Sequence, residues 1–204
     1  MIISMFNLIC ITNRNLVKED FLERIEKIVS ARPKAIILRE KDLSQQEYEI
    51  IAKKVIEICE KYDTVCILHS FYTVAYRLDC RAIHMPLFML REMSEAERKT
   101  FDILGASCHS VEEAREAENL GCTYITAGHI FKTDCKKGLQ ERGLDFLQRV
   151  CEAVSIPVYA IGGIAPENSS DVIKSGAKGG CIMSTAMKCE NPLEYFGEFN
   201  RTRR

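Results

Sequence analysis

The chain has 204 residues, a length that suits a single domain of ordinary size. Apolar residues make up 47% and charged residues 28%, enough for a large core beneath a well-solvated surface. The formal net charge of −1 gives no field that would attract nucleic acid or an anionic membrane. No stretch approaches the ~20 uninterrupted apolar residues of a membrane span, and the apolar start lacks a basic leader and a cleavage site. We therefore expect one cytoplasmic domain over residues 1–204.

Ten cysteines are scattered along the chain, and no two of them form a CxxC pair. Cys10, Cys66 and Cys181 lie inside apolar runs, where a free cysteine packs as a small hydrophobic residue. A zinc site would need clustered ligands, and the spacing provides none. We expect reduced thiols that serve packing.

Short apolar runs alternate with polar segments from one end of the chain to the other. The runs cover residues 5–12, 35–40, 64–69, 81–85, 102–108, 124–130, 157–163 and 180–185. Most are continuous and rich in Ile, Val and Ala, which is typical of parallel strands buried on both faces. The pattern predicts eight strands.

The segments between these runs carry helix signals. Residues 21–29 and residues 48–58 place apolar side chains at helical spacing. Ser110 precedes two acidic residues and is a predicted N-cap. A further helix follows Pro166 and ends at Gly176, a glycine stop. Helices therefore separate the predicted strands.

Strict alternation of strand and helix has two common outcomes, an open doubly wound sheet or a closed barrel. Eight units in so short a chain, with no GxGxxG after the first strand, favour the barrel. The weakest connection joins the fourth and fifth strands, where residues 93–99 predict only a short helix. The predicted fold is an α/β (β/α)₈ TIM barrel.

The active site of such a barrel lies at the C-terminal ends of its strands. Arg39 and Lys41 stand two apart at a strand end, so their side chains point the same way and suit an anionic substrate. His69, Ser107 and His109 also fall at strand ends and are predicted substrate contacts, with packing as the alternative for the two histidines. His84 lies within a strand and is expected to be structural.

The ends of the last two strands predict a phosphate site. Gly162 and Gly163 end the seventh strand, and Ser184 and Thr185 end the eighth. Glycines leave backbone N–H groups open to a ligand, and a following helix N-terminus adds partial positive charge. The alternative is a tight turn that needs two glycines for its backbone geometry.

The loop GHIFKTDCKKG, residues 128–138, follows a strongly apolar strand. It carries Lys132, Lys136 and Lys137 and could fold over a ligand as a lid, or could simply be a solvated charged loop. His129 sits where the strand turns into this loop, and imidazole can exchange a proton near neutral pH. A catalytic role and a structural role are both open for it.

Three segments carry a resemblance to a known family: LREK (38–41), SCHSVEEAREAENLGCTYITAGHIFKT (107–133) and PVYAIGGIAPEN (157–168). They resemble the thiamine phosphate synthase/TenI superfamily, and the similarity extends in order over almost the whole chain. The resemblance implies a (β/α)₈ barrel that acts on a thiazole phosphate in thiamin biosynthesis. That small molecule is the expected partner, and a homo-oligomer is compatible with the sequence.

The synthase branch of this superfamily joins a pyrimidine pyrophosphate to a thiazole phosphate with Mg²⁺. Its pattern has a glutamine where this chain has Ile37, Asn-Asp where it has His69 and Ser70, and an aspartate within the stretch that ends at Met89. A pyrophosphate leaving group without Mg²⁺ loses most of its charge stabilisation. The resemblance therefore makes synthase activity doubtful and predicts no metal.

The TenI branch resembles a thiazole tautomerase, an isomerase that needs no metal or cofactor. Residues 128–143, GHIFKTDCKKGLQERG, match its pattern throughout, which implies that His129 is the acid/base. The match also places Thr133, Asp134, Lys136 and Lys137 among the substrate-binding residues. The alternatives are a Mg²⁺-dependent synthase, a transferase, and a non-catalytic thiazole-phosphate-binding or regulatory paralogue, although no helix-turn-helix or basic stripe supports regulation.

Overall fold

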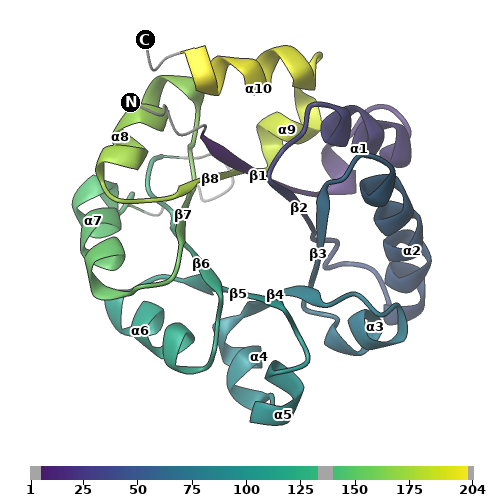
Figure 1. Cartoon of the computed structure of the whole chain (residues 1–204). Coiled ribbons are helices and arrows are strands. Elements are labelled where there is room, and N and C mark those ends of the chain that lie inside the picture. The colour runs from purple at the N-terminus through teal and green to yellow at the C-terminus, as the bar shows by residue number, and fades with distance from the viewer. Residues whose placement is uncertain (1–5, 133–139, 202–204) are drawn as a thin grey trace.

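The structure is a computed structural model that describes residues 6–132 and 140–201. Eight parallel strands follow one another in chain order around a closed barrel, and β8 pairs with β1 to complete it (Figure 1). The predicted (β/α)₈ barrel is confirmed.

Each predicted apolar run overlaps one strand, with β4 ending one residue after its run and β8 beginning one residue before its run. The strands are β1 (Asn7–Ile11), β2 (Ala35–Leu38), β3 (Val65–His69), β4 (Ala82–Pro86), β5 (Ile103–Cys108), β6 (Tyr124–Gly128), β7 (Val158–Ile161) and β8 (Gly179–Ile182). The prediction that the eighth strand extends to residue 185 is wrong, because the chain leaves the barrel after Ile182. Ser184 and Thr185 are instead the first residues of a helix.

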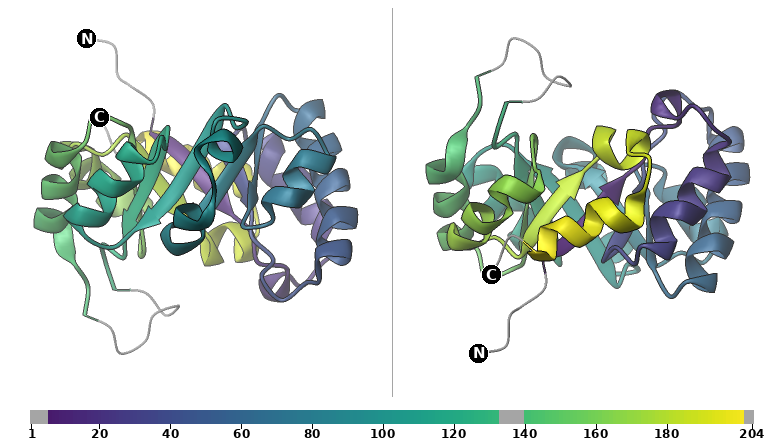
Figure 2. Two further views of the ribbon diagram at one scale, coloured as in Figure 1. Left: turned by 90° about the horizontal axis from the view of Figure 1, so that it is seen from below. Right: turned by 90° about the horizontal axis from the view of Figure 1, so that it is seen from above.

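Helices surround the strands on the outside (Figure 2). They are α1 (Phe21–Ser30), α2 (Gln45–Lys61), α3 (Tyr72–Arg77), α4 (Leu87–Glu92), α5 (Glu95–Arg98), α6 (Val111–Asn119), α7 (Gly143–Ala153), α8 (Ser169–Lys174), α9 (Ser184–Lys188) and α10 (Pro192–Arg201). Within the described residues, 3₁₀ turns cover Arg14–Leu16 and Pro166–Asn168. None of the described helices is long and apolar enough to cross a membrane.

The predicted helix signals are confirmed where the structure tests them. The Ser110 hydroxyl accepts a hydrogen bond from the backbone N–H of Glu113 and so caps α6. Gly176, with φ of 92°, follows the last turn of α8 in the left-handed region that glycine adopts without strain. The link between β4 and β5 holds the short α5, where Ser94 and Glu97 form a capping box.

Apolar side chains divide into two layers because successive strand residues face opposite sides. The layer between strands and helices is the larger of the two. The layer inside the barrel contains Ile9, Ile11, Ala35, Ile37, Ile67, Ala82, Tyr124, Tyr159 and Cys181. All nine cysteines in the described residues are free, as predicted, and burial raises the pKa of the Cys10 and Cys181 thiols.

Candidate active site

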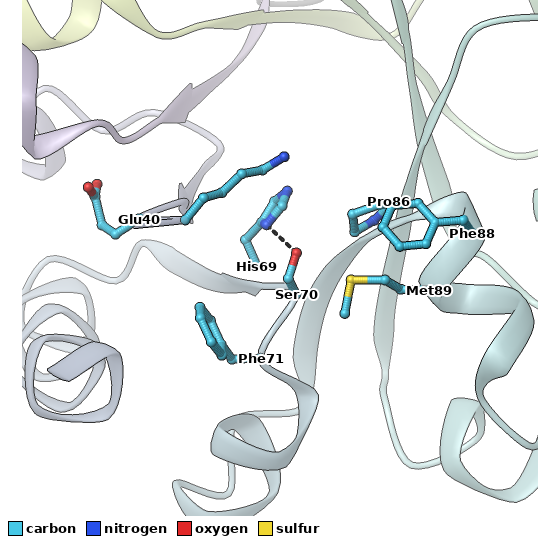
Figure 3. Close-up of a pocket in the computed structure, with 8 residues that line it drawn as sticks. Glu40, His69, Ser70, Phe71, Pro86, Phe88 and Met89 are labelled. Atoms are coloured by element: carbon cyan, nitrogen blue, oxygen red, sulfur yellow. Dashed lines mark hydrogen bonds between the residues drawn. The ribbon is translucent and has the colours of Figure 1, made fainter. Parts of the chain in front are cut away.

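A cavity of about 310 Å³ opens at the ends of β2, β3 and β4 (Figure 3). Its residues are Glu40, Lys41, His69, Ser70, Phe71, Pro86, Phe88 and Met89. The lining is partly polar and partly apolar. Its polar side chains are Glu40, Lys41, His69 and Ser70, and the others are apolar or aromatic. Such a mixed pocket at the mouth of a barrel is a typical small-molecule site.

Glu40 fixes the end of β2, although it was not among the predicted site residues. Its carboxylate is 2% exposed and accepts hydrogen bonds from the Thr12 hydroxyl at 2.6 Å and the Arg14 backbone N–H at 3.0 Å. The Thr12 hydroxyl oxygen accepts in turn from the Arg39 backbone N–H at 2.9 Å. The loop after β1 is thereby tied to the segment that carries Arg39 and Lys41. In the sequence, the position of Glu40 between the cations Arg39 and Lys41 was the feature that could have indicated its role.

The predicted pair Arg39 and Lys41 lies close enough to His69 for both charges to act on its imidazole. Burial, and then the charge of Arg39, lower the pKa of Lys41. Burial is also the main cause that lowers the pKa of His69 to about 2, followed by His84 and then by the two cations. The cavity therefore combines a neutral imidazole with two nearby cationic side chains, which can attract an anionic ligand.

The position of His69 depends on a tyrosine between two strands. The Tyr48 hydroxyl, fully buried on α2, donates to the Leu38 carbonyl at 2.6 Å and accepts from the His69 backbone N–H at 2.9 Å. The hydroxyl thus bridges the ends of β2 and β3. The His69 ring itself contacts the Ser70 hydroxyl, with 2.7 Å between Nδ1 and Oγ (Figure 3). His69 therefore lies on the cavity wall, and its contact with a substrate stays a prediction.

Ser107, another predicted contact, belongs to a polar cluster inside the barrel. Its Oγ lies 2.8 Å from His84 Nε2, and His84 Nδ1 lies 2.9 Å from the Tyr124 hydroxyl. Gly105 makes room for this arrangement, because a Cβ there would come within 2.2 Å of the Tyr124 ring. His84 is thus a buried network residue, in keeping with the structural role expected for it.

His129 directly follows β6 and is 6% exposed. Its Nε2 has no hydrogen-bond partner among the described residues, which is unusual for a buried ring nitrogen. Its backbone is held on both sides: the Gly128 carbonyl accepts from His109 Nδ1 at 3.0 Å, and the His129 carbonyl accepts from the Arg142 N–H at 3.1 Å. The exposed His109 therefore supports the peptide before His129.

The glycine pair packs tightly against the same segment. Gly162 and Gly163 have φ of 99° and 66°, in the left-handed region. A Cβ on Gly162 would lie 2.5 Å from His129 Cβ, and one on Gly163 would lie 2.6 Å from the Lys132 carbonyl oxygen. The tight-turn interpretation accounts for both glycines without a ligand, and phosphate binding stays a prediction.

The other predicted phosphate residues, Ser184 and Thr185, begin α9 just after β8. Since β7 and β8 are neighbouring parallel strands, both predicted phosphate pairs leave the barrel at the same side of its mouth. The predicted residues Thr133, Asp134, Lys136 and Lys137 lie outside the described residues, and so does most of the predicted lid.

The donor set of the described residues does not fit the Mg²⁺ ion that the synthase branch would use. Mg²⁺ is bound mainly through carboxylate and other oxygen ligands. Among the described residues that line the cavity, Glu40 is the one carboxylate, and it is already engaged by Thr12 and Arg14. Ser70 and Met89, where the resemblance predicts aspartates in a synthase, line the cavity, and the described chain has no group of three His, Cys, Asp or Glu side chains suited to a metal.

The family model for thiamine monophosphate synthase, TMP-TENI, matches residues 8–186. The chain belongs to this family. A putative thiamine-phosphate synthase 2 of Aquifex aeolicus is 36% identical over 172 residues, which are 84% of this chain and 92% of the relative. The thiamine-phosphate synthase of Clostridium acetobutylicum is 32% identical over 191 residues, 91% of this chain and 89% of the relative.

Solved structures agree with the family assignment. A thiamine phosphate pyrophosphorylase from Pyrococcus furiosus superposes with a TM-score of 0.83 at 30% identity, covering 98% of this chain and 96% of that one. A 3-hexulose-6-phosphate synthase, at 15% identity and a TM-score of 0.71, shares the fold alone. The predicted superfamily is therefore confirmed, whereas these thiamin-related relatives carry the name of a synthase or pyrophosphorylase and not of a tautomerase.

Proposed function

We propose that this member of the thiamine monophosphate synthase family, an enzyme of thiamine biosynthesis, is a thiazole tautomerase. It would convert a carboxythiazole phosphate to its aromatic tautomer. The observation that carries the proposal is the buried His129 imidazole at the end of β6, whose Nε2 has no partner among the described residues. The sequence around it resembles the tautomerase branch from residue 128 to residue 143.

The proposed tautomerisation requires one group that can both accept and donate a proton. A proton must leave C2 of the thiazole ring, and the exocyclic carbon must gain one. A single imidazole within reach of both carbons can take the first proton and deliver the second. Aromatisation of the ring drives the reaction, so acid–base catalysis by His129 would suffice.

The remaining predicted residues supply binding. Arg39 and Lys41 would hold the substrate carboxylate or stabilise negative charge that develops on the ring. The phosphate would lie against the Gly162–Gly163 backbone and the start of α9, at Ser184 and Thr185. The contacts proposed for the rest of the site are His69, Ser107, His109, Thr133, Asp134, Lys136 and Lys137.

The second candidate is the Mg²⁺-dependent synthase, a transferase. The names of the relatives favour it. The cavity disfavours it, since Ser70, Phe71 and Met89 offer no carboxylate and Glu40 is engaged elsewhere. The two candidates therefore differ in a property that is simple to measure, the need for a divalent cation.

The test supplies each set of substrates to the purified protein. We expect the carboxythiazole phosphate to be isomerised in the presence of EDTA, followed through the change in ring absorbance. With pyrimidine pyrophosphate, thiazole phosphate and Mg²⁺, we expect no thiamin phosphate. Formation of thiamin phosphate that EDTA abolishes would replace the tautomerase with the synthase. Binding of thiazole phosphate without either reaction would identify a non-catalytic paralogue.

A further inference from the structure

The barrel interior holds a hydrogen-bonded chain of three side chains that acid–base catalysis by His129 does not use. The Tyr124 hydroxyl contacts His84 Nδ1 at 2.9 Å, and His84 Nε2 contacts Ser107 Oγ at 2.8 Å. Tyr124 and His84 are 5% and 3% exposed, whereas Ser107 is only partly buried at the end of β5. The chain therefore runs from the apolar interior of the barrel towards its mouth.

The direction of these hydrogen bonds follows from the surroundings of Tyr124. Its ring belongs to the apolar cluster inside the barrel, and His84 is the one hydrogen-bond partner of its hydroxyl among the described residues. Burial raises the pKa of Tyr124, so the phenol keeps its hydrogen. A buried hydroxyl hydrogen without an acceptor is unfavourable, and the Tyr124 O–H must therefore donate to His84 Nδ1.

His84 then has a single tautomer. Burial, with smaller contributions from Arg39 and Lys41, lowers the pKa of His84 to about 3, so the ring is neutral and carries one N–H. Since Nδ1 accepts from Tyr124, that hydrogen is on Nε2 and is donated to Ser107 Oγ. The direction of the second hydrogen bond therefore follows from the direction of the first.

Ser107 is the end of the chain. Its oxygen accepts from His84 and, at 3.4 Å, from the hydroxyl of Thr126, which is 2% exposed. A hydroxyl oxygen has two lone pairs, so both are occupied and only the O–H remains. Ser107 lies near the C-terminal end of β5, so this hydrogen is available to a ligand bound at the mouth of the barrel.

We propose that Tyr124 and His84 are positioning residues that hold Ser107 as a hydrogen-bond donor to the substrate. This point of the site would accept a ligand atom with a free lone pair, such as a carboxylate oxygen or an unprotonated ring nitrogen, and would disfavour an N–H or O–H group. The inference rests on the proposed function for the identity of the substrate, but not for the direction of the hydrogen bonds.

The first experiment tests the direction without any ligand. The chain has four histidines, so ¹⁵N-histidine labelling gives a simple imidazole spectrum. The variants His69→Gln, His109→Gln and His129→Asn assign the other three rings and leave His84 by elimination. We expect His84 to be neutral with its hydrogen on Nε2, and Tyr124→Phe to shift its Nδ1 resonance. A hydrogen on Nδ1, or a charged ring, would overturn the proposal.

The second experiment measures binding of the aromatic carboxythiazole phosphate, the product of the proposed reaction, by calorimetry in a double-mutant cycle. Ser107→Ala should weaken binding about 10-fold or more, as expected for loss of a hydrogen bond to a charged or strongly accepting atom. Tyr124→Phe should weaken it less, and the double variant should bind no more weakly than Ser107→Ala, because Tyr124 acts through Ser107.

Tyr159→Phe is the matched control, since Tyr159 lies in the same interior layer, 5.9 Å from Tyr124 between ring centroids. It should leave affinity within about 2-fold, a change near RT. Additive losses in the double variant, or equal losses for Tyr124→Phe and Tyr159→Phe, would indicate packing and overturn the proposal. Failure of the wild-type protein to bind the carboxythiazole phosphate would refute the proposed substrate, while the His84 tautomer would still decide the direction of the hydrogen bonds.

Discussion

The residue that decides the proposed chemistry is His129, a buried imidazole that the described residues leave without a hydrogen-bond partner at Nε2. Replacing it with asparagine keeps a similar size and one polar edge but removes proton exchange at neutral pH. Because general acid–base catalysis by one group is typically worth 10²- to 10⁴-fold, we expect His129→Asn to lower turnover by about that factor. Ligand affinity should stay within a few-fold. Turnover and ligand affinity are measured together, with thermal melting as the check on folding.

His109→Gln is the companion variant. The His109 ring contacts the Gly128 carbonyl and not, among the described residues, His129 itself. Its loss should reduce turnover less than the loss of His129. Near-normal turnover in a folded His129→Asn protein would remove His129 from the mechanism and direct attention to His69 and His109.

A second residue-scale feature is the contact between Gly162 and His129. An alanine at 162 would adopt φ of 99° and place its Cβ 2.5 Å from His129 Cβ. Strain and overpacking together should destabilise the protein by about 3 kcal/mol, measured by chemical denaturation. The same contact should make Gly162→Ala lower turnover.

Gly121 provides the matched control for that substitution. It also has a positive φ, 91°, but a Cβ there would meet nothing within 4 Å. Gly121→Ala should therefore cost only the backbone strain, about 1 kcal/mol. Equal destabilisation by the two variants would show that the overlap with His129 is not what requires glycine. Phosphate binding is better tested at Ser184 and Thr185, since a side chain on Gly163 would also collide with Lys132.

At the scale of elements, the geometry of the barrel mouth depends on buried side chains that form hydrogen bonds between neighbouring strand ends. Glu40 ties the loop after β1 to the end of β2, and Tyr48 bridges the ends of β2 and β3. Glu40→Gln should reduce stability by about 2 kcal/mol, because a neutral amide cannot accept all the hydrogen bonds of a buried carboxylate. It should also weaken anion binding, because the end of β2 that carries Arg39 and Lys41 would no longer be fixed through Thr12.

Asp42→Asn is the control for the Glu40 variant. Asp42 also binds Arg14, through two hydrogen bonds of 2.6 and 2.8 Å, but it is exposed to solvent. Exposed ion pairs contribute little, so this variant should change stability and anion affinity far less. Calorimetric titration with inorganic phosphate and denaturant unfolding compare the two. Equal effects would contradict the role given to the buried carboxylate.

For the whole molecule, the two interior histidines set an expected dependence of stability on pH. His69 and His84 have their pKa values lowered to about 2 and about 3, mainly by burial. Between those values and the ordinary pKa near 6.5, the unfolded chain binds more protons than the folded one, so stability falls as pH falls. Each histidine should cost about 2 kcal/mol at pH 5 relative to neutral pH.

Urea unfolding at pH 7, 6 and 5 measures this loss above the range where carboxylates titrate. His84→Gln should flatten the curve, because it removes one of the groups that the unfolded state protonates. His109→Gln, at an exposed ring, is the matched control. A pH dependence that His84→Gln leaves unchanged would mean that His84 does not account for the acid destabilisation.

Local sequence determined which elements form and in what order. Continuous apolar runs indicate strands buried on both faces, and the spacing of apolar residues in α1 and α2 indicates helices, because burial alternates with a period set by backbone geometry. Caps such as Ser110 and stops such as Gly176 act over three or four residues. The resulting succession of strand and helix identified the barrel and placed Arg39, His69, Ser107 and His129 at its mouth.

Tertiary structure alone decided which side chains meet there. Glu40 and Thr12 are 28 residues apart, and His84 and Tyr124 are 40 apart. Their contacts depend on the register between strands, and a shift of one residue would turn each side chain to the other face. The same register brings Gly162 against His129, so a glycine pair that suggested a phosphate site also proves necessary for packing. No local pattern carries that information, because these residues meet only when strands that are distant in the sequence pair with one another.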